Sequence, residues 1–293
     1  MDSYLWRMKW LLLISTLLST QTAIAQNCCG STAYCNKRFN QMVFVSTHNS
    51  YNYKKGPTQF IWPNHTYPVK KQLADGVRNL MLDVYDIDGT IYLYHGNPKM
   101  GKEKLQIVLT DIKAFLDSNK TEIVSIIFQN GITKNRIAAE IDSAGLSTYC
   151  HSQAADREWP TIGQMINDNK RLVLFVEENT GTDVPYIHSA WDYIFDTPWN
   201  TKSLAEMNTR IGRGKPTHGL FLMNNWISKG KPTKKNARQT NNEKFLLERI
   251  ERCAKDLHRI PNFIGINFHE QGDAVKVAKM LNDGLADTLL AKP

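Results

Sequence analysis

The 293-residue sequence lacks the motifs of several large enzyme classes. It contains no HExxH pair, no GxSxG elbow, no GxxxxGK[ST] loop and no CxxC pair, which argues against zincins, serine hydrolases, P-loop proteins and zinc ribbons. It also has no internal repeat and no long linker rich in serine, glycine or proline. Apolar residues make up 42% and charged residues 22% of the chain. This balance predicts one globular domain with a core of its own.

Only one apolar run is long enough to concern a membrane, and it lies at the N-terminus. A basic start is followed by the apolar stretch Leu11–Leu18 and by the small residues Ala23–Ala25 of a cleavage site. The stretch is too short to span a bilayer. We therefore predict a signal peptide over residues 1–25 and a secreted protein, extracellular or periplasmic, made of residues 26–293.

All five cysteines follow this predicted cleavage point. Exported chains usually form disulfides, and an odd number leaves at least one thiol outside an intrachain bridge. We expect a Cys28–Cys35 bridge first and a Cys150–Cys253 bridge second. No histidine lies near the first group in sequence, so a metal cluster is not expected there. The segment Asn64–Thr66 matches a glycosylation sequon, which matters only in a eukaryotic host.

Apolar, β-branched segments alternate with helical patterns along the chain. The segments that read as buried strands are 43–46, 79–83, 123–128, 171–176, 219–223 and 263–268. Between them, residues 105–119 and 242–257 have helical spacing. Near-continuous apolar strands fit a parallel sheet covered on both faces. Repeated strand–helix units at this length predict a (β/α) barrel, with a doubly wound sheet as the alternative.

Polar side chains stand at the strand ends, where a (β/α) barrel builds its active site. One rim is expected to gather the side chains of His48, Asn49, Asp83, Gln129, Glu177 and Asn224. The pair Asp88-Gly89 predicts a two-residue hairpin, whose second arm returns His95 to the level of Asp83. Two histidines in one site suit a reaction that needs a base and an acid near neutral pH, such as phosphodiester cleavage.

Three motifs are more specific: Thr47–Tyr51, Gln72–Asp86 and Leu93–Gly96. Together they resemble the X domain of phosphatidylinositol-specific phospholipase C, and most closely the secreted phospholipase-C-like phosphodiesterases, with weaker matches over the rest of the chain. The resemblance implies a single distorted TIM-type barrel. It also implies that His48 is the general base and His95 the general acid when the inositol 2-hydroxyl attacks the phosphorus and diacylglycerol leaves.

The resemblance also concerns calcium. Calcium-dependent relatives use four liganding positions, and Asn49 and Asp83 stand at two of them. Met81 and Gln129 replace the other two carboxylates. Calcium prefers six to eight oxygens, often from several carboxylates. We therefore expect either no required cofactor or a weak calcium site at Asn49 and Asp83.

Other departures from the family pattern concern the substrate. Metal-free relatives carry an arginine where Asp83 stands, and Arg78 has the opposite strand parity and should face elsewhere. No residue that neutralises the phosphate is therefore identified. Asn267 stands where secreted relatives commonly carry aspartate, which would weaken the support of His48. Glu177 is acidic where enzymes that read phosphoinositides use lysines, so extra ring phosphates are disfavoured.

These features predict a monomeric phospholipase-C-type phosphodiesterase acting on a phosphoinositide or glycolipid. The aromatic segment Phe60–Pro63 and the basic residues between Lys229 and Arg238 suit peripheral contact with an anionic membrane. The formal net charge of +8 is modest and no binding motif accompanies it, so no nucleic acid partner is expected. Two alternatives stay open. One is a barrel that binds lipid or sugar phosphate with weakened catalysis, and the other is a metal-dependent glycerophosphodiesterase, against which Met81-x-Asp83 argues.

Overall fold

The computed structural model describes residues 27–56, 58, 60–129 and 131–292. The predicted signal peptide, residues 1–25, lies outside the described residues. Within the described part of the chain, no helix combines the length and the apolar character that crossing a bilayer requires.

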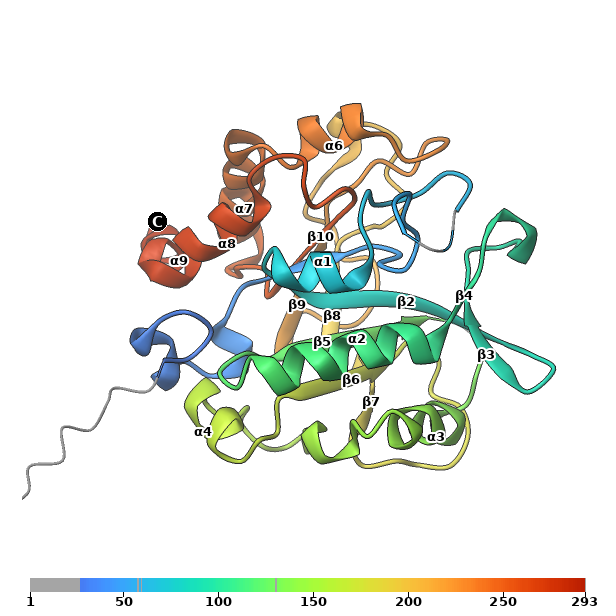
Figure 1. The fold of residues 1–293 in the computed structure, drawn as a ribbon. Helices are drawn as coiled ribbons and strands as arrows, with labels where there is room; N and C mark the ends of the chain where they lie inside the picture. Colours follow the sequence, from blue (N-terminus) through green and yellow to red (C-terminus); the bar gives the residue numbers. More distant parts are fainter. Residues whose placement is uncertain (1–26, 57, 59, 130, 293) are drawn as a thin grey trace, which may run out of the picture.

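Parallel strands form the wall of a barrel (Figure 1). The wall consists of β1 (Phe44–Thr47), β2 (Val77–Ile87), β5 (Val124–Gln129), β6 (Leu172–Val176), β7 (Ile187–Ser189), β8 (Ile194–Asp196), β9 (Leu220–Asn224) and β10 (Phe263–Ile266). The order β7-β6-β5-β2-β1-β10-β9-β8 follows the chain around a circle. The described residues form no ladder between β7 and β8, so the barrel is open at that seam. A distorted TIM-type barrel is thereby confirmed, and the doubly wound alternative, whose strand order reverses, is excluded.

Helices cover the outside of the wall. They are α1 (Val69–Ala74), α2 (Leu105–Ser118), α3 (Lys134–Ser143), α4 (Ile162–Asn167), α5 (Ala190–Tyr193), α6 (Lys234–Thr240), α7 (Glu243–Leu257), α8 (Ala274–Met280) and α9 (Ala286–Leu290). Short 3-10 or π turns occupy Thr32–Asn36, Phe39–Gln41, Pro98–Met100, Ser147–Tyr149, Leu204–Glu206 and Leu281–Leu285. The two helical segments predicted from spacing correspond to α2 and α7. Helix α2 packs against α1, and α8 packs on β1.

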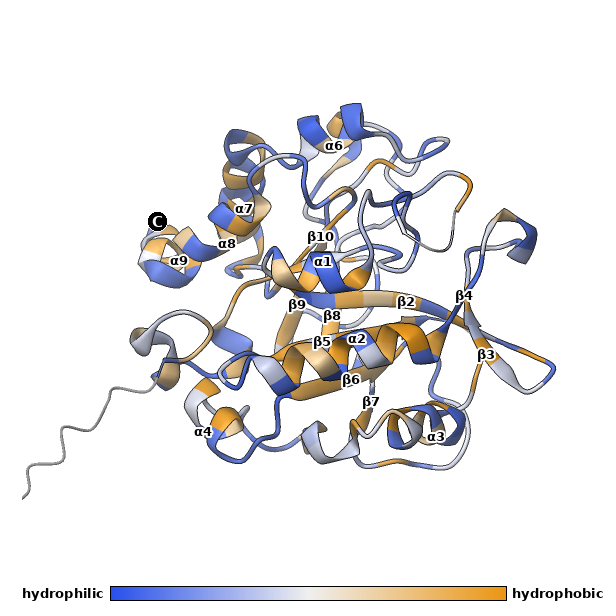
Figure 2. Cartoon of the chain, viewed as in Figure 1, coloured by the Kyte–Doolittle hydropathy of each residue, from blue (hydrophilic) through white to orange (hydrophobic). Residues whose placement is uncertain are grey.

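Strand parity separates the two sides of the wall. On β2, Leu80 belongs to the core between strands and helices, whereas Met81 belongs to a second core inside the barrel. Alternate side chains of a strand point to opposite faces, so Asp83 follows Met81 to the inside. Arg78 shares the parity of Leu80, and its Nε lies 2.8 Å from Glu122 Oε2. Arg78 therefore faces away from Asp83, as predicted. Figure 2 shows hydrophobic residues gathered along the strands and hydrophilic residues over α6.

Beyond the barrel mouth, β2 continues into a hairpin. Its partners are β3 (Thr90–Leu93) and, beyond that, β4 (Glu103–Lys104). The register pairs Val84 with Leu93, as the Asp88-Gly89 turn predicts. Both turn residues have positive φ, 51° and 81°, as a two-residue turn of this kind requires. The hairpin carries the chain back toward the mouth of the barrel.

The expected disulfides are half correct. Cys28 and Cys35 are bonded, which confirms the first pairing. Cys150 and Cys253 are both buried and free, so the second pairing is wrong. Cys150 lies beside β6, whereas Cys253 packs against β9. Because four strands separate β6 from β9 in the sheet, the two thiols cannot meet.

Candidate active site

His48 stands directly after β1, at the mouth of the barrel. Its backbone N–H donates to the carbonyl of Ile266 on β10, at 3.0 Å. Its ring lies flat on Trp226, with centroids 4.0 Å apart and planes 6° apart, and its Nδ1 lies 3.1 Å from Asn267 Oδ1. Burial lowers the pKa of His48 to about 3, and the contact with Asn267 offsets only part of that effect. The ring is therefore a neutral imidazole near neutral pH.

His95 comes from the hairpin and meets Asp83 as the sequence predicts. Its Nδ1 lies 2.8 Å from Asp83 Oδ2. The side chain of His95 is 67% exposed, whereas that of Asp83 is 3% exposed. The hydrogen bond to the Asp83 carboxylate raises the pKa of His95. The hydroxyl of Tyr51 faces the same Asp83 carboxylate. Burial and the charge of Asp83 raise the pKa of the Tyr51 hydroxyl well above the usual value.

Both histidines line one cleft of about 350 Å³. Its other walls come from the loops that follow β1, β3, β8, β9 and β10, and its apolar lining consists of Phe60, Ile61, Trp62, Met100, Trp199, Trp226 and Ile227. Asn49 and Asn267 also line the cleft. The neutral His48 and the carboxylate-bound His95 thus face one predominantly apolar space, with opposite shifts of pKa.

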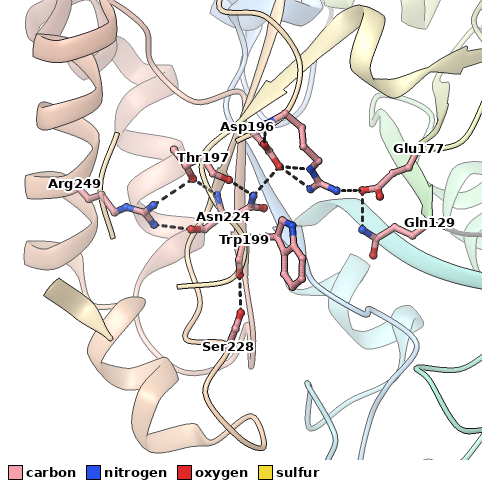
Figure 3. Close-up of polar contacts among 9 residues, drawn as sticks. Gln129, Glu177, Asp196, Thr197, Trp199, Asn224, Ser228 and Arg249 are labelled. Atoms are coloured by element: carbon pink, nitrogen blue, oxygen red, sulfur yellow. Dashed lines mark hydrogen bonds and ion pairs between the residues drawn. The ribbon is translucent and has the colours of Figure 1, made fainter. Parts of the chain in front are cut away.

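The remaining predicted residues form a separate cluster, which we call the rim network. It consists of Gln129, Glu177, Asp196, Arg213 and Asn224 (Figure 3). Glu177 Oε1 lies 2.7 Å from Gln129 Nε2 and 2.9 Å from Arg213 Nη1. Asp196 Oδ2 lies 2.6 Å from Arg213 Nη2 and 2.9 Å from Asn224 Nδ2. Two carboxylates therefore share one guanidinium, and these residues bond to one another rather than to the histidines.

Four residues of this region were not predicted to act in the site: Asp196, Arg213, Trp226 and Asn64. Asp196 ends the three-residue strand β8. Arg213 lies in the long irregular segment between β8 and β9, where no strand end points to it. Trp226 lies two residues beyond β9 and provides the face on which His48 rests. Asn64 was considered only as part of a sequon, yet it is 3% exposed and lies beside His48. For Arg213, the glycines on either side of it, Gly212 and Gly214, are the one sequence signal, and they indicate a tight turn at that position.

The residues at the calcium positions offer few free side-chain oxygens to a cation. Asn49 Oδ1 and Asp83 Oδ1 are buried without a hydrogen-bond partner among the described residues, which leaves two oxygens. Met81 is packed in the inner core, and Gln129 is bonded to Glu177, whose carboxylate holds a guanidinium. Calcium needs six to eight oxygens. The described part of the chain also contains no group of three or more histidine, cysteine, aspartate or glutamate side chains placed to hold a metal.

Arg249 on α7 supports the rim network from behind. It is 1% exposed, and its Nη1 lies 2.8 Å from the Asn224 carbonyl oxygen (Figure 3) and 2.8 Å from Asn225 Oδ1. Its Nη2 lies 3.3 Å from Thr197 Oγ1. Burial lowers the pKa of Arg249 to about 10, so the group stays charged at neutral pH. The guanidinium thus joins the ends of β8 and β9.

We expect Arg249→Met to lower the free energy of unfolding by about 2–4 kcal/mol. The substitution keeps most of the volume but leaves buried oxygens of Asn224 and Asn225 without a donor, at about 1–3 kcal/mol each. Urea denaturation measures the effect. Lys255→Met is the control, because Lys255 lies on the exposed face of the same helix. Equal stability of the two variants would show that Arg249 does not hold the strand ends.

Comparisons with known proteins agree with this architecture. The PI-PLC X family model matches residues 34–282. PI-PLC X domain-containing protein 1 of Arthroderma benhamiae is 27% identical over 303 residues, which cover 93% of this chain and 96% of that protein. An uncharacterized secreted protein of the same organism is 32% identical over 183 residues, 59% of this chain and 40% of that protein. A solved phosphatidylinositol-specific phospholipase C of S. aureus has a TM-score of 0.57 at 14% identity, covering 83% of this chain and 93% of its own. The chain belongs to the PI-PLC X domain family.

Proposed function

We propose that this protein is a secreted phosphodiesterase of the phospholipase C type, acting on phosphatidylinositol or a related glycolipid. One observation carries the proposal: His48 and His95 line a single cleft, one neutral through burial and the other bonded to a buried carboxylate. This is the pairing that acid–base cleavage of a phosphodiester requires. Family membership supports the reaction type, and the relative named as secreted supports export.

The proposed reaction uses the two histidines in turn. His48 Nε2 takes the proton of the inositol 2-hydroxyl, and that oxygen forms a bond to the phosphorus. The bond between phosphorus and the glycerol oxygen breaks as His95 Nε2–H gives its proton to that oxygen. Because His95 Nδ1–H donates to Asp83, Nε2 is the nitrogen of His95 that faces the leaving group. The products are a cyclic inositol phosphate and diacylglycerol, and the internal nucleophile supplies a large proximity advantage.

The two halves of the site suit the two halves of such a substrate. The cleft beside the histidines is lined mainly by tryptophan, phenylalanine and isoleucine, which suits an apolar leaving group. The rim network exposes parts of Gln129, Glu177 and Arg213, an amide, a carboxylate and a guanidinium, which suits the hydroxyls of a polyol, whereas Asp196 and Asn224 are buried behind them. Because Glu177 and Asp196 exceed the charge of Arg213 by one, we propose a head group without additional ring phosphates.

We propose that turnover needs no resident metal. The positive groups around the proposed reaction are the protonated His95 and Lys231, which line the cleft, and the guanidinium of Arg213 in the rim network, and all three come from the chain itself. The two spare oxygens of Asn49 and Asp83 fall far short of a calcium shell. In this proposal, charge that develops on the phosphoryl oxygens is stabilised by hydrogen-bond donors fixed around the cleft.

Membrane contact is proposed for one edge of the cleft, which we call the apolar tip: Ile61, Trp62 and Trp199. These side chains are 56%, 56% and 51% exposed although they are large and apolar. All three line the cleft that holds the histidines, and Lys231 lies on the same wall. The solved S. aureus relative is described in a study of its membrane binding. Docking through the apolar tip would place a bilayer lipid directly at the cleft.

We expect Ile61→Ala to weaken binding to vesicles of phosphatidylcholine and phosphatidylinositol by about threefold to tenfold, since about 1 kcal/mol of apolar burial is lost. Ile107→Ala is the matched control, because Ile107 is 46% exposed on α2, away from the cleft. Vesicle co-sedimentation compares the two. Equal affinities would place the membrane contact elsewhere.

The function itself is tested by incubating purified protein with labelled phosphatidylinositol, with and without chelator. Release of cyclic inositol phosphate in both conditions supports the proposal. Vesicle binding without product would favour a binding barrel. Activity on glycerophosphodiesters that chelator abolishes would favour the metal-dependent alternative.

A further inference from the structure

The ring of His48 is held from behind by asparagine side chains. Its Nδ1 lies 3.1 Å from Asn267 Oδ1 and 3.3 Å from Asn64 Nδ2. Asn64 and Asn267 are 3% and 6% exposed. Both amides are neutral, so hydrogen-bond geometry rather than a neighbouring charge decides which ring nitrogen of His48 carries the proton.

A row of hydrogen bonds leads from these amides to the backbone. Asn64 Nδ2 lies 2.9 Å from Asn267 Oδ1, and Asn64 Oδ1 lies 2.8 Å from Asn52 Nδ2. Asn52 Nδ2 lies in turn 3.4 Å from the backbone carbonyl oxygen of Trp62. We call Asn52, Asn64 and Asn267 the amide relay. It runs from the backbone of the apolar tip to the ring of His48.

The backbone carbonyl fixes the direction of every bond in the amide relay. A carbonyl only accepts, so Asn52 must turn its NH2 group toward Trp62 and Asn64. Asn64 then receives a donor on Oδ1 and must present its own NH2 group to Asn267. Asn267 accepts this hydrogen bond with its Oδ1. His48 Nδ1 thus faces an acceptor, Asn267 Oδ1, at 3.1 Å and a donor, Asn64 Nδ2, at 3.3 Å. Asn64 Nδ2 is closer to Asn267 Oδ1, at 2.9 Å, and donates there. The nearer partner of His48 is therefore the acceptor, which His48 meets with an Nδ1–H group.

Backbone contacts keep the members of the amide relay at their spacing. The Asn64 N–H donates to the Asn52 carbonyl at 2.9 Å, and the Asn64 carbonyl accepts from the Phe268 N–H at 2.8 Å. Beside it, His65 Nε2 lies 2.8 Å from the carbonyl oxygen of His48. The loop between β1 and α1 is thus fastened both to His48 and to the segment after β10.

We propose that the amide relay fixes His48 in the tautomer with its proton on Nδ1, which leaves Nε2 bare to accept the substrate proton. Asn52, Asn64 and Asn267 are positioning residues, since they act through His48. A ring with its proton on Nε2 has no lone pair there and cannot serve as a base at that atom. The role of His48 rests on the proposed function, but its tautomer exists without any substrate.

The test is ¹⁵N NMR of the histidine rings in the full mature protein near neutral pH, with His48→Ala used to assign the signal. Wild type should show His48 with a protonated Nδ1 and a bare Nε2. Asn64→Ala removes the middle of the amide relay and should give a mixture of tautomers or the Nε2–H form. Asn52→Ala should act in the same direction, so the test survives if one variant fails to fold.

Asn241→Ala is the matched control. Asn241 is also a buried asparagine, and its Nδ2 lies 2.9 Å from the backbone carbonyl oxygen of Asn267, so it contacts the backbone beside the amide relay and none of the relay's side-chain amides. It should keep the wild-type tautomer at a similar loss of stability. With phosphatidylinositol as substrate, Asn64→Ala should lower kcat by about 10–100-fold with little change in KM, whereas Asn241→Ala should not.

The outcomes separate the two proposals. A wild-type His48 with its proton on Nε2 overturns the amide relay, and so does an Asn64→Ala protein that keeps both the Nδ1–H tautomer and full kcat. A wild-type protein with the Nδ1–H tautomer that Asn64→Ala disturbs, but with no turnover of phosphatidylinositol, supports the relay and contradicts the proposed function alone.

Discussion

His48→Ala and His95→Ala should each reduce turnover of phosphatidylinositol by about 10²–10⁴-fold, the usual contribution of a general acid or base. His95 is an exposed residue, so its removal should leave the unfolding temperature unchanged. His48 rests on Trp226, so its removal should lower stability slightly without loss of the fold. Initial rates of cyclic inositol phosphate release and thermal unfolding measure the two effects.

His218→Ala is the control for both variants. His218 lies before β9, at the end of the barrel opposite the cleft, and should keep full activity. Near-normal turnover by either active-site variant would remove that histidine from the mechanism.

The two roles can also be told apart. A substrate with an acidic leaving group, such as a nitrophenyl ester of inositol phosphate, does not need its leaving oxygen protonated. It should restore most of the rate of His95→Ala and little of the rate of His48→Ala. The reverse pattern would exchange the assigned acid and base.

Much of this fold could be predicted because its signals are local. Each of the six predicted strands overlaps a strand of the barrel wall, since buried parallel strands are continuous apolar runs. Strands β7 and β8 were missed because each has only three residues, too few for a periodicity to register. The Asp88-Gly89 hairpin was correct in turn and register, because two-residue turns constrain both flanking strands.

The site, too, was predicted where the backbone positions it and missed where irregular segments complete it. The meeting of His48, Asp83 and His95 in one region followed from strand ends and hairpin length, which are properties of the backbone. The partners of Gln129, Glu177 and Asn224 did not follow, because Arg213 and Asp196 enter from irregular or very short segments. A missed partner of this kind changes the chemistry: a carboxylate that seemed free for metal or substrate already holds a guanidinium.

Asn64 illustrates a different limit. In sequence it belongs to a glycosylation motif, and nothing in the neighbouring residues indicates burial. Its place beside His48 arises because the loop after β1 folds back onto the segment after β10, a contact between residues separated by 203 positions. Such long-range packing of neutral amides has no sequence pattern, whereas His48 and His95 sit in specific motifs.

Asp83→Asn should lower kcat/KM near pH 7.5 by about 10²-fold or more, because Asp83 prepares His95 as the acid. The hydrogen bond to the carboxylate raises the pKa of His95, so the protonated ring persists to higher pH than an ordinary histidine allows. Without the carboxylate the pKa falls, and activity is lost at lower pH as the acid deprotonates. The basic limb of the pH profile of kcat/KM should therefore move to lower pH. The acid limb, which reports the buried His48, should stay in place far below pH 6.

The same variant decides between two roles of Asp83, because a ligand and an orienting carboxylate respond differently to calcium. If Asp83 chiefly orients His95, Asp83→Asn stays slow at any calcium concentration and keeps its displaced basic limb. Wild type should then retain its activity in chelator, since Asn49 and Asp83 leave only two spare oxygens for a cation. Recovery of Asp83→Asn in excess calcium, together with loss of wild-type activity in chelator, would instead make Asp83 a metal ligand. In that case Glu177 would have to leave the guanidinium of Arg213 to complete the calcium shell, and Arg213→Met should tighten calcium binding. If Asp83 acts only on His95, Arg213→Met should leave calcium binding negligible.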